Sequence, residues 1–268
     1  MLRPPAVAGR FYPDDPEKLK QQLSSFVTLA EQLPRETVAC MVPHAGYRYS
    51  GVIAGAVYAR LNLPSRFLLI GPRHFPRGKP EAILSTGAWQ TPLGRAQIDS
   101  ELAGELRAAH PGLCEDAVAH QTEHALEVQL PFLQFLSADF RFVPIGLGPI
   151  DYAELKALGE AIAVVLGRQT EPVLMIASSD MNHYESEEVT RRKDMLALER
   201  VLHLDPQGLF DIVRREDISM CGAGPVATVL TAARLLRATR ATLVRYGTSA
   251  DVNGDTKEVV GYAGVIVE

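Results

Sequence analysis

Short runs of apolar residues recur along the chain, each bounded by glycine, proline or polar residues. Their length and their content of β-branched residues are typical of strands that are buried on both faces of a sheet. The pattern therefore predicts strands at residues 38–42, 67–70, 140–145, 173–177, 241–246 and 262–267.

Longer segments between these runs carry apolar residues at helical spacing. In residues 16–33, Leu19, Leu23 and Phe26 fall on one face of a helix, and Pro16 suits its first turn. Further helices are predicted at residues 50–61, 99–109, 123–136, 151–166, 186–202, 206–215 and 224–236. Because strands and helices alternate and no linker divides residues 1–268, we expect a single α/β domain with a central mostly parallel or mixed sheet flanked by helices.

Composition narrows the class of protein. Hydrophobic residues make up 47% of the chain and charged residues 22%, which is ordinary for a folded soluble domain. The net charge of −5 and the lack of a basic tract argue against nucleic-acid binding and against a polybasic membrane anchor. There is no apolar leader and no apolar run of the roughly 18 residues that would span a membrane. We expect a cytoplasmic protein.

The three cysteines are widely spaced and form no Cys-x-x-Cys pair, which argues against a disulfide framework and a zinc ribbon. Cys40 lies in an apolar run and is expected to be a small buried residue, and Cys114 suggests no role. Cys221 directly precedes the predicted helix at 224–236, where a helix N-terminus would favour the metal-binding thiolate. A buried structural cysteine is the alternative.

Histidines follow several predicted strands. His44 follows the strand at 38–42, His74 follows the strand at 67–70, and Asp180 and His183 follow the strand at 173–177. Ligand sites in open α/β sheets lie beyond the carboxyl ends of the strands, so these side chains are predicted to converge. Two imidazoles and one anionic ligand suit a transition metal with open coordination positions. The alternative is that each histidine is bonded to loop backbone.

The sequence allows two interpretations of Asp180 and His183, one functional and one structural. In the functional one, His183 moves protons for a metal-bound substrate, while Asp180 orients an imidazole or hydrogen-bonds behind the ligands. In the structural one, their loop only leads into the helix at 186–202, where Ser186 or a nearby aspartate caps the first turn.

A rival metal motif is His120-Gln121-Thr122-Glu123-His124. On a helix it would match the His-x-x-Glu-His pattern of zinc peptidases, so a zinc hydrolase is a further alternative. The segment looks like a helix start, and Pro131 follows soon after, which weakens that reading. The sequence has no P-loop and no Gly-x-Ser-x-Gly motif, so it favours neither a nucleotide-binding protein nor a serine hydrolase.

Ordered motifs along the whole chain resemble those of the Memo family, called AmmeMemoRadiSam system protein B in bacteria and archaea. The matching segments are Ala8-Gly9-Arg10-Phe11-Tyr12-Pro13, Pro43-His44-Ala45-Gly46-Tyr47, Gly71-Pro72-Arg73-His74, Thr91-Pro92-Leu93-Gly94, Glu123-His124 with Glu127-Val128-Gln129-Leu130-Pro131-Phe132, Ser178-Ser179-Asp180 with His183-Tyr184, Cys221-Gly222 and Val260-Gly261-Tyr262.

Memo proteins resemble class III extradiol dioxygenases, which hold non-haem iron with two histidines and a glutamate. The resemblance implies that fold here, with His44 and His74 as metal ligands and His183 as the acid or base. Cys221 stands where the dioxygenases carry glutamate, and a thiolate shifts metal preference toward Cu(I) or Zn. We expect one mononuclear metal, Fe(II) or Cu with Zn as a third choice, and redox or dioxygenase-like chemistry.

The remaining expectations concern the pocket and its partners. The resemblance implies that Glu123, His124 and Tyr47 line the pocket or brace the ligands. The ligand would be a small molecule or a peptide, and the alternative to an oxidoreductase is a non-enzymatic metal- or peptide-binding module for signalling or assembly. The group name implies a pathway shared with AMMECR-type and radical SAM proteins.

Overall fold

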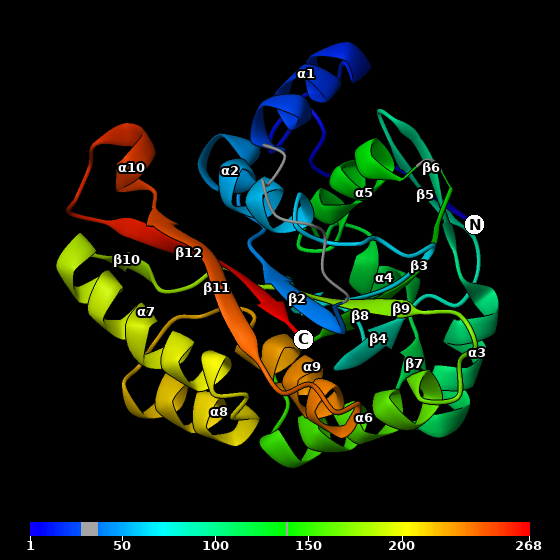
Figure 1. The fold of residues 1–268 in the computed structure, drawn as a ribbon. Helices are drawn as coiled ribbons and strands as arrows, with labels where there is room; N and C mark the ends of the chain where they lie inside the picture. The colour runs from blue at the N-terminus through cyan, green and yellow to red at the C-terminus, as the bar shows by residue number, and fades with distance from the viewer. Residues whose placement is uncertain (28–36, 138) are drawn as a thin grey trace.

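Four of the predicted apolar runs form the centre of one sheet in the computed structural model, which describes residues 1–27, 37–137 and 139–268 (Figure 1). These central strands are β8 (Arg141–Leu147), β3 (Arg66–Pro72), β9 (Val173–Ser178) and β2 (Ala39–Val42), which are parallel and adjacent in that order. Every residue of β2 and β3 is buried because helices cover both faces of the sheet. The parallel centre agrees with the prediction.

Further strands extend the sheet on both sides, so that twelve strands pair in the described residues. On one side lie β6 (Gly94–Ile98), β5 (Ala88–Thr91), β1 (Leu2–Arg3), β4 (Glu81–Ile83) and β7 (Cys114–Glu115), and on the other β12 (Val259–Val267), β11 (Ala241–Thr248) and β10 (His183–Glu185). Because β12 runs antiparallel to β2, the sheet is mixed. The short edge strands were not predicted, since segments this short carry too few residues for a period to show.

Two layers of helices enclose the sheet (Figure 1). One face is covered by α1 (Pro16–Phe26), α2 (Tyr47–Tyr58) and α5 (Leu130–Leu136), and the other by α3 (Ser100–Ala109), α6 (Tyr152–Leu166), α7 (Glu187–Leu202), α8 (Pro206–Arg215) and α9 (Ala223–Leu235). Short helices α4 (Ala117–His120) and α10 (Ala250–Asn253) lie in connections. These helices confirm the predicted α/β class. The last part of the helix predicted at 16–33 lies outside the described residues.

Several helices begin where the sequence supplies a capping side chain. Asp15, Asp99, Asp151 and Asp205 accept backbone N–H groups at the starts of α1, α3, α6 and α8. Ser186 does the same for α7 by accepting the N–H of Val189, as the structural reading of that loop predicted. Polar side chains therefore set the boundaries that periodicity alone leaves approximate.

The helix predicted at 123–136 is wrong in its first half. Helix α4 ends at His120, residues 127–129 form one 3₁₀ turn, and α5 begins only at Leu130. The carboxylate of Glu123 accepts the backbone N–H groups of His124 and Ala125, which a continuing helix would bond to carbonyls instead. The irregular stretch carries two of the residues predicted for the site.

None of the helices in the described ranges is both long enough and apolar enough to cross a membrane.

Candidate metal centre

The parallel strands bring the predicted ligands to one edge of the sheet. His44 follows β2, His74 follows β3, and Asp180 follows β9, which lies between those two strands. Cys221 comes from the loop before α9. The potential ligand atoms of His44, His74 and Cys221 lie within 4.8 Å of one another, and Cys221 Sγ is 3.2 Å from His44 Nε2. The structure thus brings together the three side chains that the sequence indicated.

Hydrogen bonds determine which nitrogen of His44 faces the cluster. Ser178 Oγ donates its only hydrogen to the carbonyl of Ala125, at 2.6 Å, and accepts from Gln129 Nε2 at 3.0 Å. His44 Nδ1, 2.9 Å from the same oxygen, must therefore be the donor in that contact. Nε2 of His44 is left with a free lone pair, which is the state that binds a metal.

His74 is held in the same tautomer by Glu123. Its Nδ1 lies 2.9 Å from Glu123 Oε1, and its backbone N–H donates to Oε2 at 2.6 Å. Burial disfavours the charged carboxylate, but the hydrogen bonds and charge of His74 outweigh burial and hold the pKa of Glu123 at about 2. Since an ionised carboxylate only accepts, Nδ1 carries the proton and Nε2 is free to bind metal.

The electrostatics of the cluster suit neutral imidazole at His44 and His124. Burial, followed by the charge of His74, lowers the pKa of His44 to about 3. Burial, followed by the charge of His44, lowers the pKa of His124 to about 4. Burial lowers the pKa of His74, but the hydrogen bond to Glu123 and the charges of Glu123 and Asp180 together outweigh burial and raise it overall. Only His74 therefore tends to hold a second proton.

The expectation for the Cys221 thiol is corrected by its surroundings. Cys221 stands just before the start of α9, as predicted, but burial followed by the negative charge of Asp180 raises its pKa well above the ordinary value. Desolvation of the thiolate outweighs the helix N-terminus. The thiolate at this position therefore needs a cation, which is what a bound metal would provide.

Asp180 acts on the backbone of His44 and not on its ring. Its Oδ1 accepts the N–H groups of His44 at 2.7 Å and Ala45 at 3.3 Å, whereas its Oδ2 is 4.0 Å from His44 Nε2. Burial raises the pKa of Asp180 against these two hydrogen bonds. Asp180 thus fixes the turn that presents His44.

His183 has a fixed orientation beside the cluster. Its backbone N–H donates to Ser219 Oγ at 2.7 Å, and its Nδ1 donates to the Ser219 carbonyl at 3.0 Å, so that Nε2 is the acceptor nitrogen of the neutral ring. Asn182 accepts from the N–H and hydroxyl of Ser219, and Asp194 in turn accepts the N–H of Asn182 at 2.8 Å. Ser219, which is itself bonded to buried Asn182, therefore fixes the orientation of His183.

Three other predicted residues lie in different surroundings. His124 stacks on His74, with ring centroids 4.5 Å apart, and belongs with Glu123 to a second group of potential ligands around His74. Tyr47 is buried in the core, and its hydroxyl donates to the carbonyl of Val128 at 2.6 Å. His120 is fully buried against Trp89 and belongs to neither ligand group found in the described residues.

The zinc-peptidase pattern is not realised, because α4 ends at His120 and leaves Glu123 and His124 outside the helix. Sequence reasoning missed Gln129 and Ser219, and it gave Ser178 no part in the metal site. Gln129 belongs to the matched motif segment, but Ser219 lies outside every motif and only its contacts reveal it.

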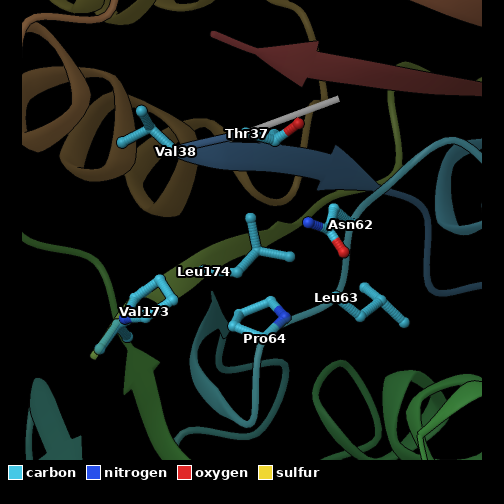
Figure 2. Close-up of a pocket in the computed structure, with 8 residues that line it drawn as sticks. Thr37, Val38, Asn62, Leu63, Pro64, Val173 and Leu174 are labelled. Atoms are coloured by element: carbon cyan, nitrogen blue, oxygen red, sulfur yellow. The ribbon is translucent and has the colours of Figure 1, made fainter. Parts of the chain in front are cut away.

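A separate pocket of about 460 Å³ lies at the opposite edge of the sheet, near the starts of β2 and β9 (Figure 2). Figure 2 shows Thr37 and Val38 on one side and Asn62, Leu63 and Pro64 on the other. Among the residues that the structure describes, its lining has no titratable side chain and so supplies no group for acid, base or metal chemistry.

The fold and the cluster define an α/β protein with a candidate mononuclear metal centre at the carboxyl edge of its parallel strands. A family model described as Memo-like protein matches residues 3–266. A MEMO1 family protein of Methanosarcina barkeri is 41% identical over 268 residues, covering 100% of both chains. Another, of Pyrobaculum arsenaticum, is 39% identical over 276 residues, covering 99% of this chain and 98% of the relative. The chain belongs to the Memo family.

A solved structure shares the fold. The uncharacterized protein JW3007 from Escherichia coli K12 superposes with a TM-score of 0.61 at 12% sequence identity, covering 86% of this chain and 100% of that one. At that identity the similarity supports the architecture alone.

Proposed function

We propose that this protein binds one mononuclear transition metal, Fe(II) or Cu, through His44, His74 and Cys221 and uses it for redox or dioxygenase-like chemistry on a small molecule. The observation that carries the proposal is the convergence of these three donors, with ligand atoms within 4.8 Å of one another. In the neutral ring of each histidine the unprotonated nitrogen is Nε2, because Nδ1 carries the proton toward Ser178 or Glu123.

The nitrogen and sulfur donors of this site suit a transition metal better than a cation that prefers oxygen ligands. Imidazole suits Fe, Cu and Zn, and a thiolate adds preference for Cu(I) or Zn, whereas Mg²⁺ and Ca²⁺ prefer oxygen ligands. When bound, the metal would supply a Lewis acid with open positions for dioxygen and a small ligand. Zinc stays the third choice.

His183 is the proposed acid and base. Its Nε2 is free to accept a proton, and the ring is partly exposed while its other nitrogen is bonded to Ser219. Asp180 is a positioning residue in this scheme, because its carboxylate holds the backbone N–H groups of His44 and Ala45. The residues of this chain would thus orient the ligands and move one proton.

The test is the metal content of protein purified without oxygen. His44→Ala, His74→Ala and Cys221→Ala should each abolish near-stoichiometric Fe or Cu, whereas the surface variant His203→Ala should keep it. Anaerobic handling matters because oxidation of Cys221 would remove a ligand. Metal that persists in all three ligand variants would contradict the assignment.

Turnover is tested separately. His183→Ala should keep the metal and lose oxygen consumption with enolic or aromatic compounds, since the imidazole serves proton transfer and not metal binding. If His183→Ala instead keeps all oxygen consumption, His183 is not the acid and base.

A non-enzymatic module that binds a metal or a peptide is the second candidate function. Phe75 lies three residues after Pro72, the last residue of β3, and its side chain is 45% accessible. This exposed aromatic ring favours a ligand-binding face beside the cluster. A module of this kind would keep ligand affinity in His183→Ala and would consume no oxygen in the wild type.

A further inference from the structure

A groove of about 730 Å³ opens beside the cluster, on the side of His124. Its volume lies within the roughly 300–1,000 Å³ that small-molecule sites occupy. The groove is lined by Arg10 and Phe11 from the segment before α1 and by Phe75 and Arg77 from the loop after β3. It therefore combines two aromatic rings with two guanidinium groups.

One imidazole ring connects the groove to the metal ligands. The ring of Phe11 lies 4.8 Å from that of His124, and the ring of His124 stacks on that of His74 at 4.5 Å with an interplanar angle of 24°. His124 lines the groove while His74 belongs to the ligand cluster. A molecule in the groove would thus lie beside the metal centre.

The charge of the groove differs from that of the whole chain. The protein carries a net charge of −5, yet the lining residues include Arg10 and Arg77 and no aspartate or glutamate. Both arginines are exposed, and in residues 1–27, 37–137 and 139–268 neither forms an ion pair with a carboxylate. Two guanidiniums without acidic partners beside two aromatic rings are complementary to an anion on an apolar body.

Hydrogen bonds hold the backbone of both walls. On one side, buried Glu127 accepts the N–H groups of Ala6 at 2.7 Å and Val7 at 3.0 Å, and the Val7 carbonyl accepts the N–H of Arg10 at 3.0 Å. On the other side, Arg73 donates to the carbonyl of Arg77. The positions from which the two guanidiniums extend are therefore set before any ligand binds.

We infer that the groove binds a small carboxylate or phosphate monoester on a flat apolar body, with the anion paired to Arg10 and Arg77 and the body against Phe11 and Phe75. The opposite end of the molecule would lie against His124, next to the metal centre. As an assignment of substrate class, this inference rests on the proposed function.

The test compares anionic and neutral ligands of one shape by calorimetric titration: 2-naphthoate, 2-naphthyl phosphate and 2-naphthalenemethanol. Metal-free wild type should bind at least one anion about 10-fold or more tightly than the alcohol, since hydrogen bonds to charged groups exceed neutral ones by this order. The relative affinities of the two anions identify the headgroup. Arg10→Gln with Arg77→Gln should remove the preference, and Arg168→Gln, an exposed arginine at the other edge, should keep it.

Equal affinity for the anions and the alcohol would overturn the inference, as would an equal loss in Arg168→Gln. Tight binding of an acidic peptide through Arg10 and Arg77, without binding of either naphthyl anion, would replace the small molecule with a protein segment.

Cobalt(II)-loaded protein distinguishes this inference from the proposed function. A change in the cobalt absorption spectrum on adding the preferred anion would place that ligand at the metal centre, and an unchanged spectrum at saturation would overturn its assignment as substrate. Anion preference in a protein that takes up no metal would contradict the proposed function and leave the groove as a binding site.

Discussion

Glu123 binds His74 twice, through a 2.9 Å contact with the ring Nδ1 and a 2.6 Å bond from the backbone N–H. The same carboxylate accepts the N–H groups of His124 and Ala125. One buried side chain therefore fixes the tautomer of a metal ligand, the place of its backbone and the course of the loop that carries His124.

Replacing this carboxylate should weaken metal binding. Glu123→Gln keeps the size of the side chain but can present its amide to His74 Nδ1, which favours the wrong tautomer. We expect metal affinity to fall about 10- to 100-fold, the range found when partners of ligating histidines are changed. Competition with a chelator measures the affinity. Glu115→Gln, a partly exposed carboxylate paired with Arg107, should leave it unchanged, and an unaltered affinity in Glu123→Gln would refute the role.

Ser178 should matter for both stability and metal binding. Ser178→Ala removes the acceptor for His44 Nδ1 and leaves that buried donor without its partner. We expect a loss of about 1–3 kcal/mol in the free energy of unfolding, from the desolvated donor, and weaker metal binding. Denaturant unfolding and metal titration check the two effects, with the exposed Ser25→Ala as control. Retention of full stability would show that His44 finds another acceptor.

The buried carboxyl of Asp194 should make stability depend on pH. Burial raises its pKa to about 7 from an ordinary 3.8, against hydrogen bonds from the N–H of Asn182 and the hydroxyl of Tyr246. Between these pH values the folded protein holds a proton that the unfolded chain has released. Stability from this group therefore falls as pH rises through that window, by at most about 1.4 kcal/mol per pH unit.

Asp194→Asn removes this titration while keeping an acceptor for Asn182 and a donor toward Tyr246. The difference in unfolding free energy, variant minus wild type, should rise with pH from about 4 to about 7 and then level off. The buried histidines, whose pKa values are lowered, add stability as pH rises and so oppose the effect of Asp194. Because they are present in both proteins, their contribution cancels in the difference. A difference that does not vary with pH would mean that Asp194 titrates alike in both states.

Gly261 should not accept a side chain. A Cβ at this position of β12 would collide with Oδ2 of Asp194 and press on Met181. We expect Gly261→Ala to destabilise the fold by about 1–3 kcal/mol, the usual cost of overpacking. Gly104 in α3 is the matched control, since a Cβ there meets nothing within 4 Å and Gly104→Ala should stabilise by up to about 1 kcal/mol. Thermal unfolding of both variants gives the comparison, and equal melting temperatures would refute the predicted contrast.

The central strands, most of the helices and the trio of His44, His74 and Cys221 could be predicted from the sequence. Buried strands and amphipathic helices are local patterns, and residues that directly follow parallel strands must meet at one edge of the sheet. The family motifs added Glu123 and His124 without saying what they contact.

The protonation and orientation of these groups depend on contacts between segments that are distant in the sequence. The bond between Glu123 and His74 joins residues 49 positions apart, and the contact between Cys221 and His44 spans 177 positions. The prediction of a helix at 123–136 was wrong in its first half for the same reason, because the carboxylate of Glu123 accepts the backbone N–H groups of His124 and Ala125 while it also holds His74. Burial likewise reversed the expected pKa shift of Cys221. Periodicity records which residues face the core, whereas desolvation and long-range hydrogen bonds depend on which other segments surround them.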